Sequence, residues 1–198
     1  VINGPKNPQF SFATTLTGEI RDRDAELLVD YKNGKGETGV LLGVNARPLF
    51  EGHGKGNGIA FTLIPENPIV AFQRFHFNEN HNWIYLHKNM RVYANVDMWD
   101  EEGMGFRVHS VPGDTVSLQN IDVEIRRIRL QEITRVLPYF PEITGLFSLE
   151  AHYIQTEKDL QLSAEASVDE LTYERQRIGD VALGATWLPG EQLSLIHI

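Results

Sequence analysis

Apolar and polar residues alternate along most of this chain, and this period of two limits its possible folds more than any other feature. Residues Ile121, Val123 and Ile125 alternate, after which the pattern slips by one residue to Ile128. Alternation is typical of a strand with one buried face, and a one-residue slip predicts a β-bulge. A second slip follows Val168, where the apolar positions move to Leu171. Similar runs along the chain predict roughly ten to thirteen strands, joined by short turns into antiparallel meanders.

One stretch departs from the alternation. Apolar residues there follow a spacing of three and four, as on one face of a helix, at Leu130, Ile133, Val136, Leu137 and Phe140. Pro138 and Pro141 limit this helix, because proline lacks the N–H group and clashes with the preceding turn. We therefore expect one short helix at about 131–140, placed as a plug or cap against the sheet.

The strand pattern predicts a mainly β protein, and we expect an elongated, curled antiparallel β-sheet (a β-trough, or "taco") with that single helix. Few helical residues are available to cover the apolar face of such a sheet. Either a second sheet closes on that face, as in a sandwich or barrel, or the sheet curls into an open apolar trough. An open trough would suit acyl chains, since exposed apolar surfaces mark binding sites. The pattern alone is compatible with both architectures.

Several segments predict turns. The loop KNGKGE at 32–37 is typical of a hairpin, with Asn33 and Gly34 as the residues that tolerate positive φ. Further turns are expected at 100–103, 156–159 and 175–180. Prolines disfavour central strand positions, so Pro48 is expected away from one. The segments 59–64 and 69–77 are expected to form two strands around Pro65 and Pro68.

Composition excludes several classes of function. The formal net charge of −9 argues against a nucleic-acid partner, which needs clustered Lys and Arg. The chain has no cysteine, and therefore no disulfide, thiol nucleophile or cysteine-based zinc site. No stretch approaches the roughly 20 apolar residues of a membrane-spanning helix.

No motif predicts an active site. His76, His81 and His87 do not have the spacing of a metal site, and exposed or pairing histidines are the better interpretation. The acidic tip at Asp97 and 100–102 lacks the spacing of a calcium loop. The glycine-rich segment EGHGKGNG at 51–58 has neither a P-loop nor a dinucleotide fingerprint. We expect no enzyme, no catalytic residue, no metal and no cofactor.

The two ends of the chain suggest a fragment. The sequence begins at Val1 rather than Met, so we expect it to belong to a longer protein. The last six residues, LSLIHI at 193–198, are encoded by CTG TCT CTT ATA CAC ATC. That string resembles the mosaic-end adapter of transposase-based sequencing libraries. We therefore expect 193–198 to be a sequencing artefact and leave it out of the fold.

Three segments resemble the TamB family of AsmA-like, bridge-like lipid transfer proteins, namely residues 69–98, 121–153 and 160–187. The pattern "Leu-x-x-Ile…Leu-Pro-Tyr-x-Pro-x-Ile-x-Gly" between two strands carries most of this resemblance. It implies a TamB-like β-trough segment over 69–192, preceded by an N-terminal β-meander portion over 1–68. The family has no enzymatic motif, so the resemblance transfers no catalytic residue.

The resemblance also implies a function. Proteins of this family cross the periplasm and shield phospholipid acyl chains in an apolar groove, for transport between the inner and outer membranes. It further implies a periplasmic location, with an inner-membrane anchor outside this fragment. The expected partners are phospholipids and an outer-membrane assembly protein of the BamA/TamA type. The alternative is a closed β-sandwich or barrel that serves as a structural or adhesion module.

The alternation predicts which side chains line the lipid groove. They share one face of successive strands and are Val92, Ala94, Val96, Ile121, Val123, Ile125, Phe147, Leu149, Ala151, Leu160, Leu162, Ala164, Val181, Leu183 and Ala185.

Overall fold

The structure is a computed structural model that describes residues 12–50, 57–114, 116–136 and 141–188. One helix, α1 (Leu130–Val136), accompanies twelve strands in the described part of the chain. The strands are β1 (Phe12–Arg21), β2 (Asp24–Asn33), β3 (Thr38–Leu49), β4 (Gly58–Val70), β5 (Gln73–Arg74), β6 (His76–His87), β7 (Val92–Trp99), β8 (Gly105–Ser110), β9 (Gln119–Arg129), β10 (Ile143–Gln155), β11 (Leu160–Tyr173) and β12 (Gln176–Trp187). The adapter-like residues 193–198 lie outside the described residues.

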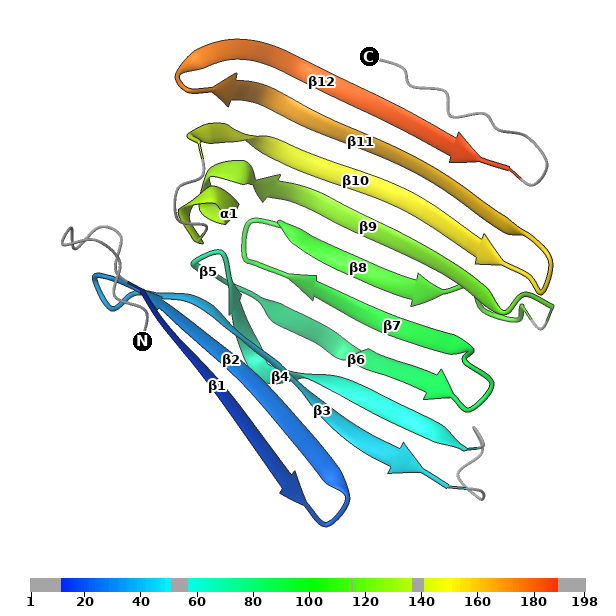
Figure 1. The fold of residues 1–198 in the computed structure, drawn as a ribbon. Helices are drawn as coiled ribbons and strands as arrows, with labels where there is room; N and C mark the ends of the chain where they lie inside the picture. Colours follow the sequence, from blue (N-terminus) through cyan, green and yellow to red (C-terminus); the bar gives the residue numbers. More distant parts are fainter. Residues whose placement is uncertain (1–11, 51–56, 115, 137–140, 189–198) are drawn as a thin grey trace.

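All twelve strands belong to one antiparallel sheet in which neighbours in sequence are neighbours in space. Its order is β1-β2-β3-β4-β6-β7-β8-β9-β10-β11-β12, with the short β5 paired to β4 alone. Figure 1 shows β6 to β12 side by side, whereas β1 to β3 run obliquely to them. The sheet is not closed into a barrel, because β1 and β12 are not paired with each other. The predicted open, curled antiparallel sheet with one short helix is confirmed.

The strand ends form two opposite edges of the sheet. The helix end carries α1, the β5 hairpin and the β7–β8 turn at 100–104. The far end carries the β6–β7 turn at 88–91, the β8–β9 loop at 111–118 and the β10–β11 turn at 156–159. In Figure 1 the helix end lies at the left and the far end at the right.

Both predicted slips are β-bulges. In β9, Ile125 faces Leu149 and Ile128 faces Phe147, so Arg126 and Arg127 together oppose Ser148. Arg127 has a φ of 51°, and its backbone N–H donates to the Ser148 hydroxyl at 3.1 Å. The second bulge lies between Val168 and Leu171 of β11. A bulge lets a long strand bend without losing its partner, which accords with the curvature of this sheet.

Most of the predicted turns are observed, with small corrections. The 32–37 loop connects β2 to β3, but its positive φ is at Gly36 (81°) rather than at Asn33 or Gly34. Asn33 instead accepts the N–H groups of Lys35 and Glu37, each at 3.0 Å. The last hairpin turns at Glu174 and Arg175, whereas residues 176–180 of the turn expected at 175–180 belong to strand β12.

The prolines lie where the hydrogen-bonded pairing between neighbouring strands ends or is interrupted. Pro48 pairs with Ile59 of β4 but lies beyond Ala46, the last β3 residue paired with β2. Pro65 and Pro68 lie inside β4, where the pairing with β3 skips from Ile64 to Ile69. The expected strand at 69–77 is wrong, because Ala71 and Phe72 adopt positive φ and reverse the chain there. The expected boundary at 68/69 falls inside β4, and one sheet runs through it.

A side chain extends the narrow junction between β4 and β6. These two strands pair only from Gly58 to Phe61, opposite His87 to Ile84. Beyond that point the Asn82 side-chain amide donates from Nδ2 to the Leu63 carbonyl at 2.9 Å, and its Oδ1 accepts from the Leu63 N–H at 3.0 Å. This amide thus satisfies two backbone groups that would otherwise lose their partners.

The core is small and lies toward the helix end. Phe75, Met98 and Met104 are buried together, and Val70, Phe77, Phe106 and Ile128 pack around them. Beside this cluster Val96 is only 1% exposed. Helix α1 packs against β10, and Arg129, just before it, forms an ion pair with Glu102 of the β7–β8 turn. Residues 137–140 of the expected helix lie outside the described residues.

We expect Val96→Ala to lower the free energy of unfolding by about 2 kcal/mol, because it removes two buried methyl groups from a closely packed site. Leu183→Ala is the matched control, since Leu183 shares the apolar face but is 44% exposed. It should cost less than about 1 kcal/mol. Urea unfolding measures both. Equal losses would show that the core extends to β12.

Candidate functional site

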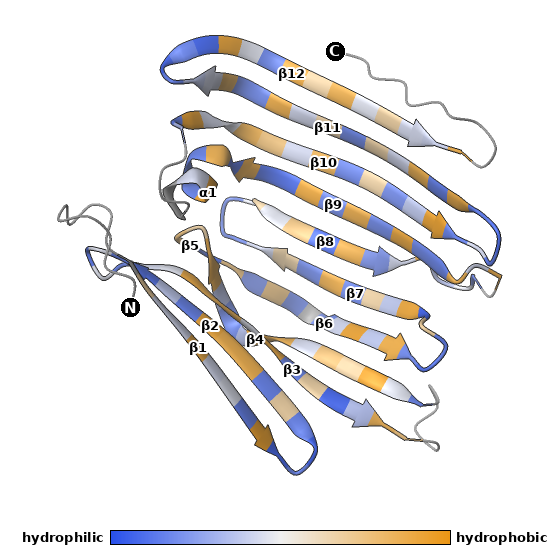
Figure 2. Ribbon diagram, in the orientation of Figure 1, coloured by the Kyte–Doolittle hydropathy of each residue, from blue (hydrophilic) through white to orange (hydrophobic). Residues whose placement is uncertain are grey.

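The pairing register collects the apolar side chains on one face of the sheet. Val96, Val108, Val123 and Ala151 lie directly opposite one another on β7, β8, β9 and β10. The same row continues through Ala164 on β11 to Ala185 on β12. All fifteen residues predicted to line the groove lie on this side, which we call the apolar face. Figure 2 shows the alternation of hydropathy along these strands.

Protein covers the apolar face unevenly. On β7, Ala94, Val96 and Met98 are buried by the chain itself. Farther along the sheet Leu162 is 37% exposed and Trp187 is 48% exposed. The part of the apolar face that is open to a ligand therefore lies toward β11 and β12.

Small side chains form one row on the part of the apolar face that crosses β10, β11 and β12. Ala151, Ala164 and Ala185 are paired across β10, β11 and β12. The neighbouring row toward the helix end is Leu149, Ala166 and Leu183, and the neighbouring row toward the far end is Tyr153, Leu162 and Trp187.

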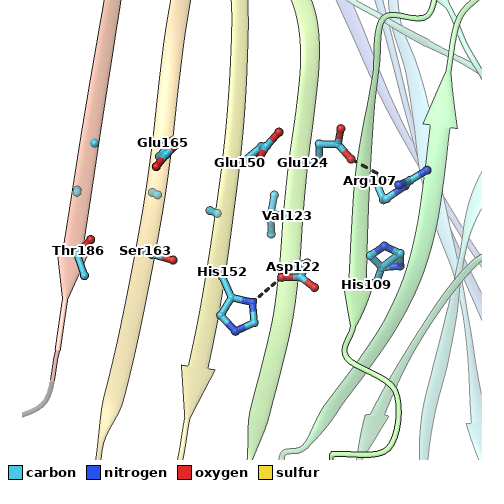
Figure 3. A pocket seen from close by; sticks show the side chains of 14 residues that line it. Arg107, His109, Asp122, Val123, Glu124, Glu150, His152, Ser163, Glu165 and Thr186 are labelled. Carbon is cyan, nitrogen blue, oxygen red and sulfur yellow. Dashed lines mark hydrogen bonds and ion pairs between the residues drawn. The ribbon is translucent and has the colours of Figure 1, made fainter. Parts of the chain in front are cut away.

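The opposite, polar face carries a hollow of about 620 Å³ over β8 to β12. Figure 3 shows two rows of polar side chains there. One row runs from Arg107 through Glu124 and Glu150 to Glu165, and the other from His109 through Asp122, His152 and Ser163 to Thr186. A second hollow of about 580 Å³ adjoins it and shares Glu124, Glu150 and Glu165. The hollows and the row of Ala151, Ala164 and Ala185 are therefore on opposite sides of the same strands.

Ion pairs neutralise one end of the acidic row. Arg107 donates to Asp97 at 3.2 Å and lies 3.6 Å from Glu124. The hydrogen bonds that Glu124 accepts from Arg126 lower the pKa of its carboxyl, and the charges of Arg126 and Arg107 add to the effect. Glu150 and Glu165 lie directly opposite each other on β10 and β11. Like charges in that position repel and destabilise a sheet.

The second row contains one close pair. His152 Nδ1 lies 2.5 Å from Asp122 Oδ1, and both side chains are partly exposed. His109 and Ser163 occupy the neighbouring register positions. Within the described residues, no three His, Asp or Glu side chains form a group that could hold a metal ion.

The histidines noticed in the sequence have other partners. His76 packs edge-on against Trp99, with ring centroids 4.6 Å apart. His87 Nδ1 lies 2.7 Å from the side-chain oxygen of Asn89. In the acidic tip, Asp100 is buried and accepts the N–H groups of Glu102 at 2.9 Å and Met104 at 2.8 Å. Asp100 thus shapes the β7–β8 turn. The segment 51–56 of the glycine-rich stretch lies outside the described residues.

A hydrogen-bonded loop connects β8 to β9 at the far end. The Asp114 carboxylate accepts from the Asn120 amide at 2.5 Å and from the backbone N–H groups of Val116 at 2.8 Å and Ser117 at 2.9 Å. These hydrogen bonds hold the pKa of the Asp114 carboxyl well below its usual range, and the bond from Asn120 has the largest effect. The loop is joined to the β6–β7 turn, because Arg91 donates to the Asp114 carbonyl and the Gln119 amide donates to the Met90 carbonyl at 2.7 Å.

The two polar rows and the joined loops at the far end were not predicted from the sequence. Their members come from strands that are distant in the chain, as with Asp122 and His152. A correct register for β9 and β10 would have predicted that pair. The alternation of apolar and polar residues does not predict the contact of Arg91 with the Asp114 carbonyl.

The chain is thus an open, single-layer β-sheet with one apolar and one polar face. It matches no protein-family model, and no match was found among curated proteins or solved structures. In the part of the chain that the structure describes, no helix has the length and hydropathy needed to cross a bilayer.

We expect Glu165→Gln to raise the free energy of unfolding by a few tenths of a kcal/mol, because it removes the repulsion with Glu150. The gain should shrink in concentrated salt, which screens exposed charges. Glu157→Gln, in the 156–159 turn, is the matched control with the same loss of charge. Urea unfolding at low and high salt measures the effect. A loss of stability in Glu165→Gln alone would mean that Glu165 has a stabilising partner.

Asp114→Ala should release the 111–118 loop, since three hydrogen bonds lose their acceptor. The protection of the Val116 and Ser117 amides against hydrogen exchange should fall, whereas Asp159→Ala in the neighbouring turn should leave it unchanged. In the wild-type chain this protection should persist at about pH 4, where an ordinary carboxyl is half protonated. A group whose folded pKa is lowered keeps its stabilising bonds above its unfolded pKa and loses them only as the pH falls through the folded pKa. Loss of protection already at pH 5 would contradict this account.

Proposed function

We propose that this chain is a segment of a TamB-like lipid conduit that shields phospholipid acyl chains on its apolar face during transport between two membranes. The observation that carries the proposal is the continuous row of apolar residues from Val96 on β7 to Ala185 on β12, which exposed apolar side chains of the same face, Leu162, Leu183 and Trp187, flank on β11 and β12. The resemblance of residues 69–98, 121–153 and 160–187 to that family supports the same function. Transport of this kind needs no cofactor and no catalytic group.

The physical driving force is hydrophobic burial. Each methylene group of an acyl chain that leaves water contributes about 0.8 kcal/mol. The apolar face offers such burial where Leu162, Leu183 and Trp187 are exposed on β11 and β12. A ligand there would also cover apolar side chains that otherwise contact water, such as Leu162 and Leu183.

The unpaired edges of the sheet are compatible with a longer conduit. Among the described strands, β1 and β12 each have one neighbour only. Further strands of a longer protein could pair with either edge and extend the apolar rows in the same register. The proposal places such a protein in the periplasm, with a membrane anchor and an outer-membrane partner outside this segment.

Leu162→Arg should reduce crosslinking to a phospholipid that carries a diazirine on its acyl chain, to less than about a fifth of the wild-type level. A guanidinium on the open apolar face replaces apolar contact with a charge that is costly to desolvate. Ser163→Arg is the matched control, because Ser163 is the next residue of β11 and lies on the polar face. Both side chains are exposed, so both variants are expected to fold. Equal labelling of the two variants and the wild-type chain would exclude this lipid path.

A further inference from the structure

The turn between β2 and β3 holds the side-chain amide of Asn33 by three hydrogen bonds. Asn33 Oδ1 accepts the backbone N–H groups of Lys35 and Glu37, each at 3.0 Å. Its Nδ2 donates to the Glu37 carboxylate at 2.7 Å. Both polar atoms of this amide are therefore positioned by the turn itself.

The residue that follows Asn33 is Gly34, which exposes its backbone nitrogen to the amide carbon of Asn33, Cγ. Glycine has no side chain, so it leaves that nitrogen unhindered and lets the backbone turn toward Cγ. Attack of the Gly34 nitrogen on Cγ closes a succinimide ring. In this reaction negative charge develops on Asn33 Oδ1, and Nδ2 leaves as ammonia.

The contacts of Asn33 suit the charges that develop in that reaction. Two backbone N–H groups directed at Oδ1 are the arrangement that stabilises an oxyanion. The Glu37 carboxyl contacts the leaving nitrogen, so it is placed to deliver the proton that the Gly34 nitrogen gives up. The attacking group, the oxyanion donors and the proton carrier thus all belong to the 33–37 turn.

We propose that the β2–β3 turn catalyses its own deamidation at Asn33. The Gly34 nitrogen forms a bond to Cγ, the Cγ–Nδ2 bond breaks, and ammonia leaves with the proton from Gly34. Water then opens the succinimide. Hydrolysis at Cγ yields aspartate at position 33, and hydrolysis at the backbone carbonyl yields isoaspartate. The inference is independent of the proposed function, because the reaction needs only this turn and water.

The product changes the turn that forms it. The new carboxylate stands where the amide donated to Glu37, and like charges at that distance repel. Isoaspartate also adds one carbon atom to the backbone at Asn33, the last residue of β2. Since the turn fixes the register of a hairpin, the pairing of β2 with β3 weakens. The change is irreversible, because the ammonia is lost.

A second Asn-Gly pair provides a comparison within the same chain. Gly58 follows Asn57 and is paired with the strands on both sides of β4. The backbone of Gly58 is thus fixed in the sheet, whereas Gly34 lies in an exposed turn. The dipeptide alone predicts the same reaction at both sites, and the structure predicts it at Asn33.

Mass spectrometry of the full chain, incubated at physiological temperature and neutral pH, tests the proposal. Peptides that contain Asn33 should gain about 1 Da, the change from an amide to a carboxyl group. The gain should be at least about tenfold faster at Asn33 than at Asn57, because two backbone donors stabilise the oxyanion of Asn33. Unfolding in urea should slow the reaction at Asn33 at least about threefold, because it removes these donors and the contact with Glu37.

Glu37→Gln should slow the reaction at Asn33 at least about tenfold, because its amide still accepts from Nδ2 but carries no proton to it. Glu26→Gln, at an exposed position of β2, is the matched control with the same loss of charge. It should react as the wild-type chain does. Gly34→Ala should also slow the reaction, because its methyl group hinders the attacking nitrogen. Circular dichroism verifies that each variant is folded.

Three results would overturn the proposal. They are equal rates at Asn33 and Asn57, a rate at Asn33 that is as high in the unfolded chain as in the folded one, and a rate that Glu37→Gln leaves unchanged. The first two would show that the sequence Asn-Gly sets the reaction without help from the fold. The third would remove Glu37 from the reaction and leave the turn without its proton carrier.

Discussion

The cross-strand register is the constraint on which the rest of this structure depends. Each strand alternates its side chains between two faces, so a shift of one residue in any pairing would exchange the faces for all later strands. The row from Val96 to Ala185 remains apolar across six strands because every pairing keeps the same parity. The bulges at Arg126–Arg127 and after Val168 do not exchange the two faces. At each bulge the apolar alternation in the sequence shifts by one residue, at the same place where the backbone inserts its extra residue.

A single-layer sheet does not bury its apolar face by itself. Here the chain covers only part of that face, over β7 and near Phe75, Met98 and Met104. Folding is thus stabilised by a local core and by the backbone pairing, while β11 and β12 keep apolar side chains in contact with water. This separation is the physical basis of the proposed lipid path, since a ligand would bury side chains that the fold leaves open.

The strands, the helix and both bulges were predictable because each depends on neighbours in sequence. The alternation around Ile121 and Val123 and the spacing from Leu130 to Val136 are local signals of backbone conformation. The error at 69–77 has a local cause as well. Ala71 and Phe72 reverse the chain with positive φ, a conformation that neither residue type signals. The contacts between side chains of distant strands and loops were not predictable in this way, because no local signal pairs His152 with Asp122 or joins Arg91 to Asp114.

The sequence by itself determined that the chain forms an antiparallel sheet with one apolar face, because apolar and polar residues alternate along each strand and successive side chains point to opposite faces. It also determined which fifteen side chains share that face, once the strands pair in order. Only the tertiary structure decided that the sheet stays open, which part of the apolar face is buried, and that Arg91 and Gln119 join the β6–β7 turn to the loop before β9. These features depend on the curvature of the whole sheet and on contacts between distant turns, and such contacts leave no periodic trace in the sequence.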